Sequence, residues 1–86
     1  MSFQSEFESL FETLKTERDE VLLKLHLASM DAKDEFIEAE QKWEELKVKA
    51  AEIGDETKET SDEFVAKANI VREELKEAYH RIKERF

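Results

Sequence analysis

Apolar residues recur along the first part of the chain in alternating steps of three and four. This spacing places side chains on one face of an α-helix, and its seven-residue period is typical of a coiled-coil seam. One member of the series, Glu17, is polar. The series comprises Phe3, Phe7, Leu10, Leu14, Glu17 and Val21.

Beyond Val21 the apolar spacing changes to an eleven-residue repeat. An eleven-residue repeat alters the supercoil of a helix without interrupting the helix itself. Because the apolar stripe stays in phase throughout and returns to seven-residue spacing, we expect one continuous helix over about residues 3–53. The stripe runs through Leu25, Ala28, Ala32, Phe36, Ala39, Trp43, Leu46, Ala50 and Ile53.

A second stripe predicts a C-terminal helix over about residues 60–86. The chain has one glycine and no proline, so Gly54 indicates the turn, at about residues 54–59. Gly54 suits the left-handed residue that closes many helices, and Asp55, Thr57 or Thr60 are candidate caps of the next helix, with a capping-box pattern from Thr60 to Glu63. The stripe comprises Thr57, Ser61, Phe64, Ala68, Val71, Leu75, Ala78 and Ile82.

These elements predict an all-α fold, a long antiparallel helical hairpin that resembles a coiled coil, in a single domain over residues 1–86. The alternative is a monomeric three-helix bundle with a second turn near Ser29–Asp31, where Ser29 or Asp31 caps a new helix. No glycine or proline marks that turn. Whether residues 3–53 form one helix or two is therefore left open.

A continuous first helix would make the hairpin lopsided. At 1.5 Å per residue it would span roughly 75 Å, against roughly 45 Å for the second helix. The N-terminal overhang would leave an apolar face exposed, which is typical of an interaction site. We therefore expect an antiparallel homodimer that completes a four-helix bundle. The predicted oligomer or partner interface consists of Phe3, Phe7, Leu10, Phe11, Leu14 and Val21.

The composition excludes several classes of function but does not identify one. The 86 residues carry a formal net charge of −9 and include no cysteine, which excludes disulfide scaffolds, cysteine-based zinc sites and thiol catalysis. The acidic balance disfavours nucleic-acid binding, because phosphate contacts need basic clusters. No apolar run approaches the roughly 20 residues of a membrane span, and the N-terminus lacks the pattern of a secretory signal. We expect a cytoplasmic protein.

One short string has the form of a metal-binding motif. Glu77 and His80 form the Glu-x-x-His pair found in carboxylate-bridged bundles. However, Leu75, Ala78 and Ile82 occupy the core positions, so Glu77 and His80 are expected to face water. We therefore predict no catalytic, cofactor-binding or metal-binding residues, no cofactor and no enzymatic activity, with a metal-binding bundle as a remote alternative.

The predicted function is that of a non-catalytic structural or protein-interaction module that self-associates through amphipathic helices. The alternative is a small acidic chaperone or regulator that binds a helix of another protein. Glu17 either sets the register of the interface, as polar residues do at coiled-coil core positions, or turns to its edge. The sequence does not identify the biological partner.

Overall fold

The computed structural model describes the backbone of residues 3–55 and 60–86, and the side chains of these ranges from Ser5 onward. Within these ranges the chain forms three α-helices, α1 (Phe3–Lys24), α2 (Met30–Gly54) and α3 (Asp62–Lys83), and one 3₁₀ turn, η1 (Leu25–Leu27). The predicted all-α class is confirmed.

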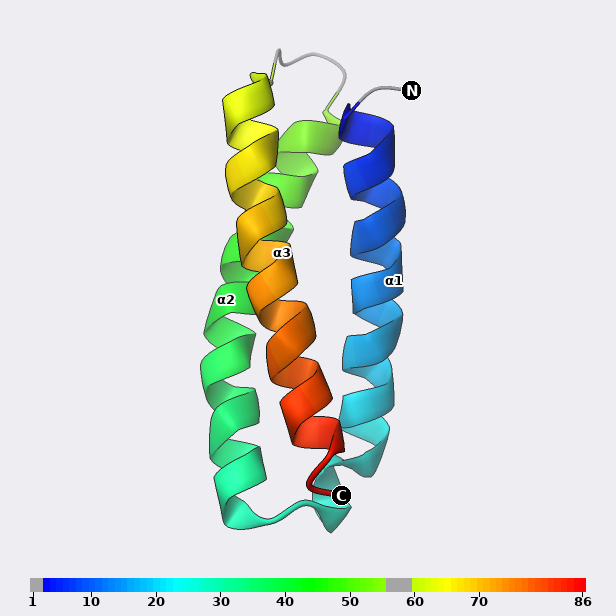
Figure 1. The fold of residues 1–86 in the computed structure, drawn as a ribbon, viewed down its shortest axis with the longest axis vertical. Coiled ribbons are helices and arrows are strands. Elements are labelled where there is room, and N and C mark those ends of the chain that lie inside the picture. The colour runs from blue at the N-terminus through cyan, green and yellow to red at the C-terminus, as the bar shows by residue number, and fades with distance from the viewer. Residues whose placement is uncertain (1–2, 56–59) are drawn as a thin grey trace.

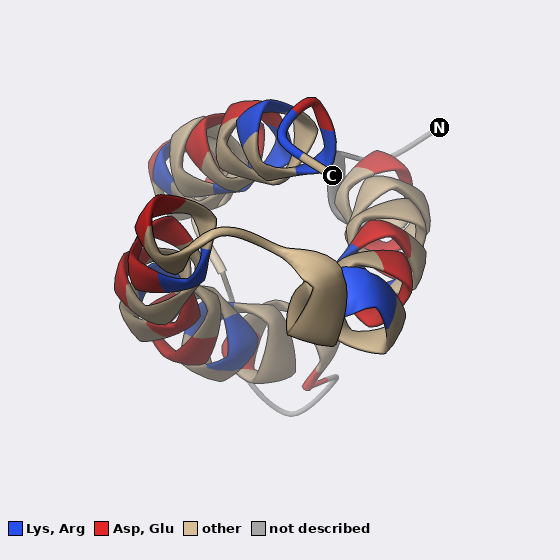
Figure 2. Ribbon diagram, turned by 90° about the horizontal axis from the view of Figure 1, so that it is seen from below, with Lys and Arg blue, Asp and Glu red and all other residues tan. Residues whose placement is uncertain are grey.

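The three helices lie side by side in an elongated body of 42 × 20 × 17 Å. α1 and α3 run in the same direction and α2 runs opposite to both (Figure 1). Figure 2, which looks along the helices, shows them around a common centre. Each helix contributes to one hydrophobic core, and α3 packs against both of the others.

The predicted continuous helix over residues 3–53 is wrong. α1 ends at Lys24, and after η1 the backbone is extended at Ala28 (ψ 155°) and Ser29 (ψ 165°). The Ser29 hydroxyl then accepts a hydrogen bond from the Ala32 backbone N–H at 3.2 Å and caps α2. A serine cap can begin a helix without a preceding glycine or proline.

The in-phase stripe across this connection is explained by where its residues lie. Leu25 in η1 and Ala28 after it are both half-buried and pack against the core. The turn thus uses the same apolar positions that a continuous helix would have used. Because α1 folds back along the other two helices, the predicted lopsided hairpin and its N-terminal overhang are also wrong.

The end of α2 differs from the expectation for Gly54. The helix ends at Gly54, and no glycine or other residue in the described part of the chain has a positive φ. The next residue, Asp55, is extended (φ −82°, ψ 108°), and its backbone N–H donates to the Glu52 carbonyl at 3.3 Å. Extended backbone at Asp55 stops the helix, so Gly54 does not need the left-handed conformation predicted for it.

The start of α3 is set by Ser61. Its hydroxyl accepts a hydrogen bond from the Phe64 backbone N–H at 3.1 Å, so the N-cap is Ser61 rather than the predicted Asp55 or Thr60. The Thr60 hydroxyl instead donates to the Glu52 carbonyl at 3.5 Å. Thr57, the remaining candidate cap, lies outside the described residues. The predicted helix over about residues 60–86 corresponds closely to α3.

The buried residues of α2 confirm its predicted stripe. On α1 and α3 the buried face is wider than the stripe predicted for it. On α1, Phe11 is half-buried against the core, whereas Leu10 is 40% exposed. On α3 a further buried row of Val65, Arg72 and Tyr79 lies beside the predicted stripe. A helix that packs against two others buries a wider face than a two-helix seam requires. The buried residues of α2 are Ala32, Phe36, Ala39, Trp43, Leu46 and Ile53.

Candidate functional site

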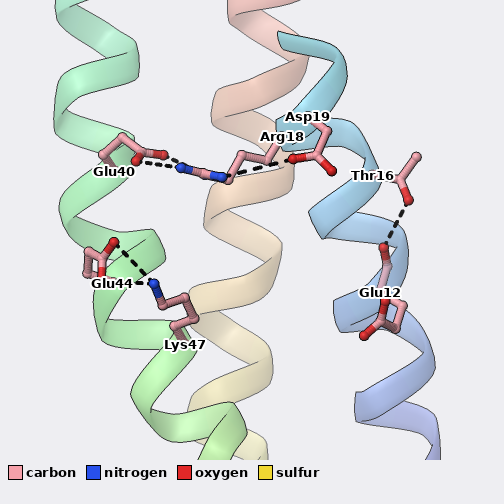
Figure 3. Close-up of polar contacts among 7 residues, drawn as sticks. All are labelled: Glu12, Thr16, Arg18, Asp19, Glu40, Glu44 and Lys47. Atoms are coloured by element: carbon pink, nitrogen blue, oxygen red, sulfur yellow. Dashed lines mark hydrogen bonds and ion pairs between the residues drawn. The ribbon is translucent and has the colours of Figure 1, made fainter. Parts of the chain in front are cut away.

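A polar cluster joins the three helices near the middle of the molecule. Arg18 of α1 donates two hydrogen bonds to the Glu40 carboxylate of α2, from Nε at 2.7 Å and from Nη2 at 2.8 Å (Figure 3). The Arg18 guanidinium also lies 5.1 Å from the centre of the Trp43 ring. The hydrogen bond to Glu40 raises the pKa of Arg18 above its ordinary value, so this cation stays charged and holds α1 against α2.

α3 contributes Tyr79 and His80 to this cluster. Tyr79 is fully buried, and within the described structure its hydroxyl has no hydrogen-bond partner. Burial raises the pKa of Tyr79 far above its usual range, and the nearby Glu40 carboxylate adds to the effect. The Glu17 carboxylate lies 3.5 Å from Nε2 of His80. With its side chain 18% exposed, Glu17 lies at the edge of the core.

This cluster is organised to position helices. Its best-formed contact is a two-point bond between an arginine and a carboxylate, a geometry that fixes the orientation of both side chains. Glu77 and His80 are both exposed, as the sequence predicts. Among the described residues, no group of three or more histidine or acidic side chains is placed to hold a metal ion.

The six residues of the predicted interface do not form one surface. Phe7, Leu14 and Val21 are at most 1% exposed and belong to the intramolecular core. Phe11 is half-buried, with its ring stacked on Trp43 at a centroid distance of 5.1 Å. Leu10 is partly exposed, and the side chain of Phe3 lies outside the described residues. Phe7, Phe11, Leu14 and Val21 pack in the core, because α1 packs against both of the other helices.

The most exposed apolar residues of the described chain lie outside the predicted interface. Three of them surround the connection between α1 and α2, where Leu23 is 76%, Leu27 70% and Met30 72% exposed. We call these three residues the η1 surface. Two more lie along α2, where Ile37 is 60% and Val48 62% exposed. Met30, Ile37 and Val48 share one side of α2, and their separations of seven and eleven residues were the signal that could have found them.

A shallow cavity borders the η1 surface. It has a volume of about 240 Å³ and is lined by Glu20, Leu23, Lys24, Lys83 and Phe86. The Lys83 ammonium donates to Glu20 at 2.8 Å, and this hydrogen bond lowers the pKa of the Glu20 carboxyl. Pockets that enclose small ligands usually measure about 300–1,000 Å³. This cavity is smaller, and its apolar walls extend the exposed apolar area toward Phe86.

Comparisons with protein-family profiles, curated protein sequences and solved structures found no significant match to this chain. Among the described residues, no helix combines the length and apolar character needed to cross a membrane.

Proposed function

We propose that this chain is a non-catalytic protein-interaction module that binds another protein through the η1 surface. The observation that carries the proposal is the exposure of Leu23, Leu27 and Met30 at one end of the molecule, 76%, 70% and 72% respectively. These three are the most exposed of the large apolar side chains in the described residues, whereas core residues such as Phe7, Leu46 and Leu75 are at 0% exposure. Contiguous apolar patches on a surface are typical of interaction sites.

The proposed partner is a different protein rather than a second copy. The η1 surface has only three residues, far fewer than the roughly 20–30 residues that each partner contributes to a standard interface. Two copies, each with a net charge of −9, also repel one another. A different protein can extend beyond this end along the side of the molecule and bring basic residues to it.

The polar cluster supports a non-catalytic role. Arg18 and Glu40 bond to each other, and Glu17 contacts His80. These groups connect α1 to the other helices, and a rigid scaffold presents a binding surface better than a mobile one.

Site-specific photo-cross-linking in cells that produce the protein tests this proposal. A photoreactive phenylalanine analogue replaces Leu27 in one version and the exposed Lys67 of α3 in the control. We expect a cross-link to a different protein from position 27 but not from position 67, and binding of that purified partner should weaken at least tenfold in Leu23→Ser/Leu27→Ser. A cross-link only between two copies, or none at position 27, would contradict the proposal.

A further inference from the structure

The outward side of α2 carries a second helical stripe that no part of the described chain covers. It continues from the η1 surface in steps of four and three, and all its members are exposed. Its apolar residues are Met30, Ile37, Val48 and Ala51. We call the stripe the outer α2 face. It consists of Met30, Asp34, Ile37, Gln41, Glu44, Val48 and Ala51.

One border of the outer α2 face, which we call the acidic border, carries a carboxylate every seven residues, with Lys42 and Lys49 between them. It is formed by four carboxylates spaced seven residues apart, Asp31, Glu38, Glu45 and Glu52, and acidic residues recur along α2 in Figure 2. The Lys42 ammonium, which follows Glu38 by one turn, bonds to Glu74 of α3 at 2.6 Å instead. Glu38 consequently has no ion pair within the described residues, whereas the exposed Glu45 lies 3.7 Å from the Lys49 ammonium. This border attracts a cationic partner.

The length of the face sets the size of its partner. At 1.5 Å per residue, the stretch from Met30 to Ala51 measures roughly 30 Å, which matches a helix of about 20 residues. A helix laid along this side follows the 42 Å long dimension of the body, and it therefore contacts more residues than the three of the η1 surface. The same helix can reach Leu27, which adjoins the start of the face.

A second copy of this chain does not fit the outer α2 face. In an antiparallel pair related by a two-fold axis, the acidic border faces itself, which brings Glu38 close to Glu45 of the other copy. In a parallel pair, each stripe residue faces its own equivalent, so Asp34 meets Asp34 and Glu44 meets Glu44. Like charges opposed across an interface are unfavourable, and both arrangements oppose them.

We propose that the outer α2 face binds a basic amphipathic helix of another protein. The partner presents apolar residues at three- and four-residue spacing to Met30, Ile37 and Val48. It presents lysine or arginine residues along one flank to the acidic border. An amphipathic helix on a complementary helical surface is a common mode of peptide recognition. This inference rests on the proposed function, since it identifies the kind of partner that the module takes.

A designed peptide tests the inference directly. The probe is a fluorescently labelled helix of about 20 residues, with leucines on one face and lysines on the other, and its control has glutamate in place of every lysine. Anisotropy measures binding to the full chain. We expect the lysine peptide to bind and the glutamate peptide not to bind, because the border repels anions.

Matched variants separate the outer α2 face from general charge attraction. Glu38→Lys/Glu45→Lys changes the acidic border, and Glu77→Lys/Glu84→Lys makes the same change in net charge on exposed positions of α3 and its C-terminal end. We expect about a tenfold or greater loss of affinity for the first pair and less than about a threefold loss for the second. Ile37→Ser/Val48→Ser should also weaken binding about tenfold. Equal losses for the two charge pairs, or unchanged binding by Ile37→Ser/Val48→Ser, would overturn the inference.

The two proposals fail in distinguishable ways. Position 27 could cross-link to a different protein while binding of the lysine peptide is unaffected by the variants of the outer α2 face. The module would then bind a partner of another kind, and only this inference would be wrong. If the peptide binds at this face but position 27 shows no cross-link in cells, the proposed function itself is wrong.

Discussion

The two faces of α2 follow similar spacing and have opposite environments. The inner face, which includes Phe36, Trp43 and Leu46, is at most 5% exposed, whereas Ile37 and Val48 on the outer face are 60% and 62% exposed. Both recur in steps of three and four. The inner stripe is uninterrupted by charge, while Asp34 and Glu44 interrupt the outer one. Spacing therefore identifies a face, and the absence of charge within it indicates which face the chain buries by itself.

The largest expected difference between the faces is in stability. Leu46→Ala should lower the free energy of unfolding by about 2–5 kcal/mol, because it removes buried methyl groups and leaves a cavity. Val48→Ala on the outer face should change it by less than about 0.5 kcal/mol. Urea denaturation followed by circular dichroism measures both, and similar losses in the two variants would show that the faces are not distinct.

The next largest effect on the free energy of unfolding is expected from substitution of the residue that caps the start of α2. Ser29→Ala removes the hydroxyl that caps the helix at 3.2 Å from the Ala32 backbone nitrogen, and it should lower the free energy of unfolding by about 1 kcal/mol. Ser29→Asp keeps an acceptor at this position and should retain most of the stability. In a continuous helix over residues 3–53, alanine would instead be favourable at this site, so an increase in the urea midpoint would contradict the observed break.

A substitution at the end of α2 should change the free energy of unfolding by a smaller amount and in the opposite direction. Gly54 is helical, and a Cβ atom added there would lie 3.6 Å from Oε1 of Glu8, an ordinary contact. Gly54→Ala should therefore raise the free energy of unfolding by about 0.4–1 kcal/mol, since alanine reduces the freedom of the unfolded chain. If Gly54 had a left-handed backbone conformation, the same substitution would lower the free energy of unfolding. Thermal and urea denaturation decide between the two.

The smallest expected change in stability is on the outer face. Ile37→Ser/Val48→Ser should alter the free energy of unfolding by less than about 0.5 kcal/mol, because both side chains are already in contact with water. The same variant is expected to lose binding of the lysine peptide, so it separates folding from recognition. A cooperative loss of helical signal at lower urea would mean that these residues contribute to the folded core.

The helical content and the buried row of α2 could be predicted from the sequence, because apolar spacing is a local property. The break after Lys24 could not, since Leu25 and Ala28 keep the stripe in phase and Ser29 is an inconspicuous cap. The predicted interface followed from that missed break. Once α1 folds back, Phe7, Leu14 and Val21 find their partners within the same chain.

The wider buried face of α3 likewise could not be predicted from apolar spacing along the chain. Val65 and Tyr79 lie beside the predicted stripe, and they are buried because α3 packs against two helices rather than one. Conversely, the exposed series of Met30, Ile37 and Val48 is visible in the sequence but has no meaning until the inner face of α2 is known to be covered.

By itself the sequence determined that this chain is acidic and helical, with amphipathic segments and a helix that ends near Gly54, because these properties depend on composition and on spacing along the chain. Only the tertiary structure decided which apolar residues are buried and which remain exposed. Burial depends on contacts between helices distant in sequence, such as the bond between Arg18 of α1 and Glu40 of α2. The same contacts leave the η1 surface and the outer α2 face exposed.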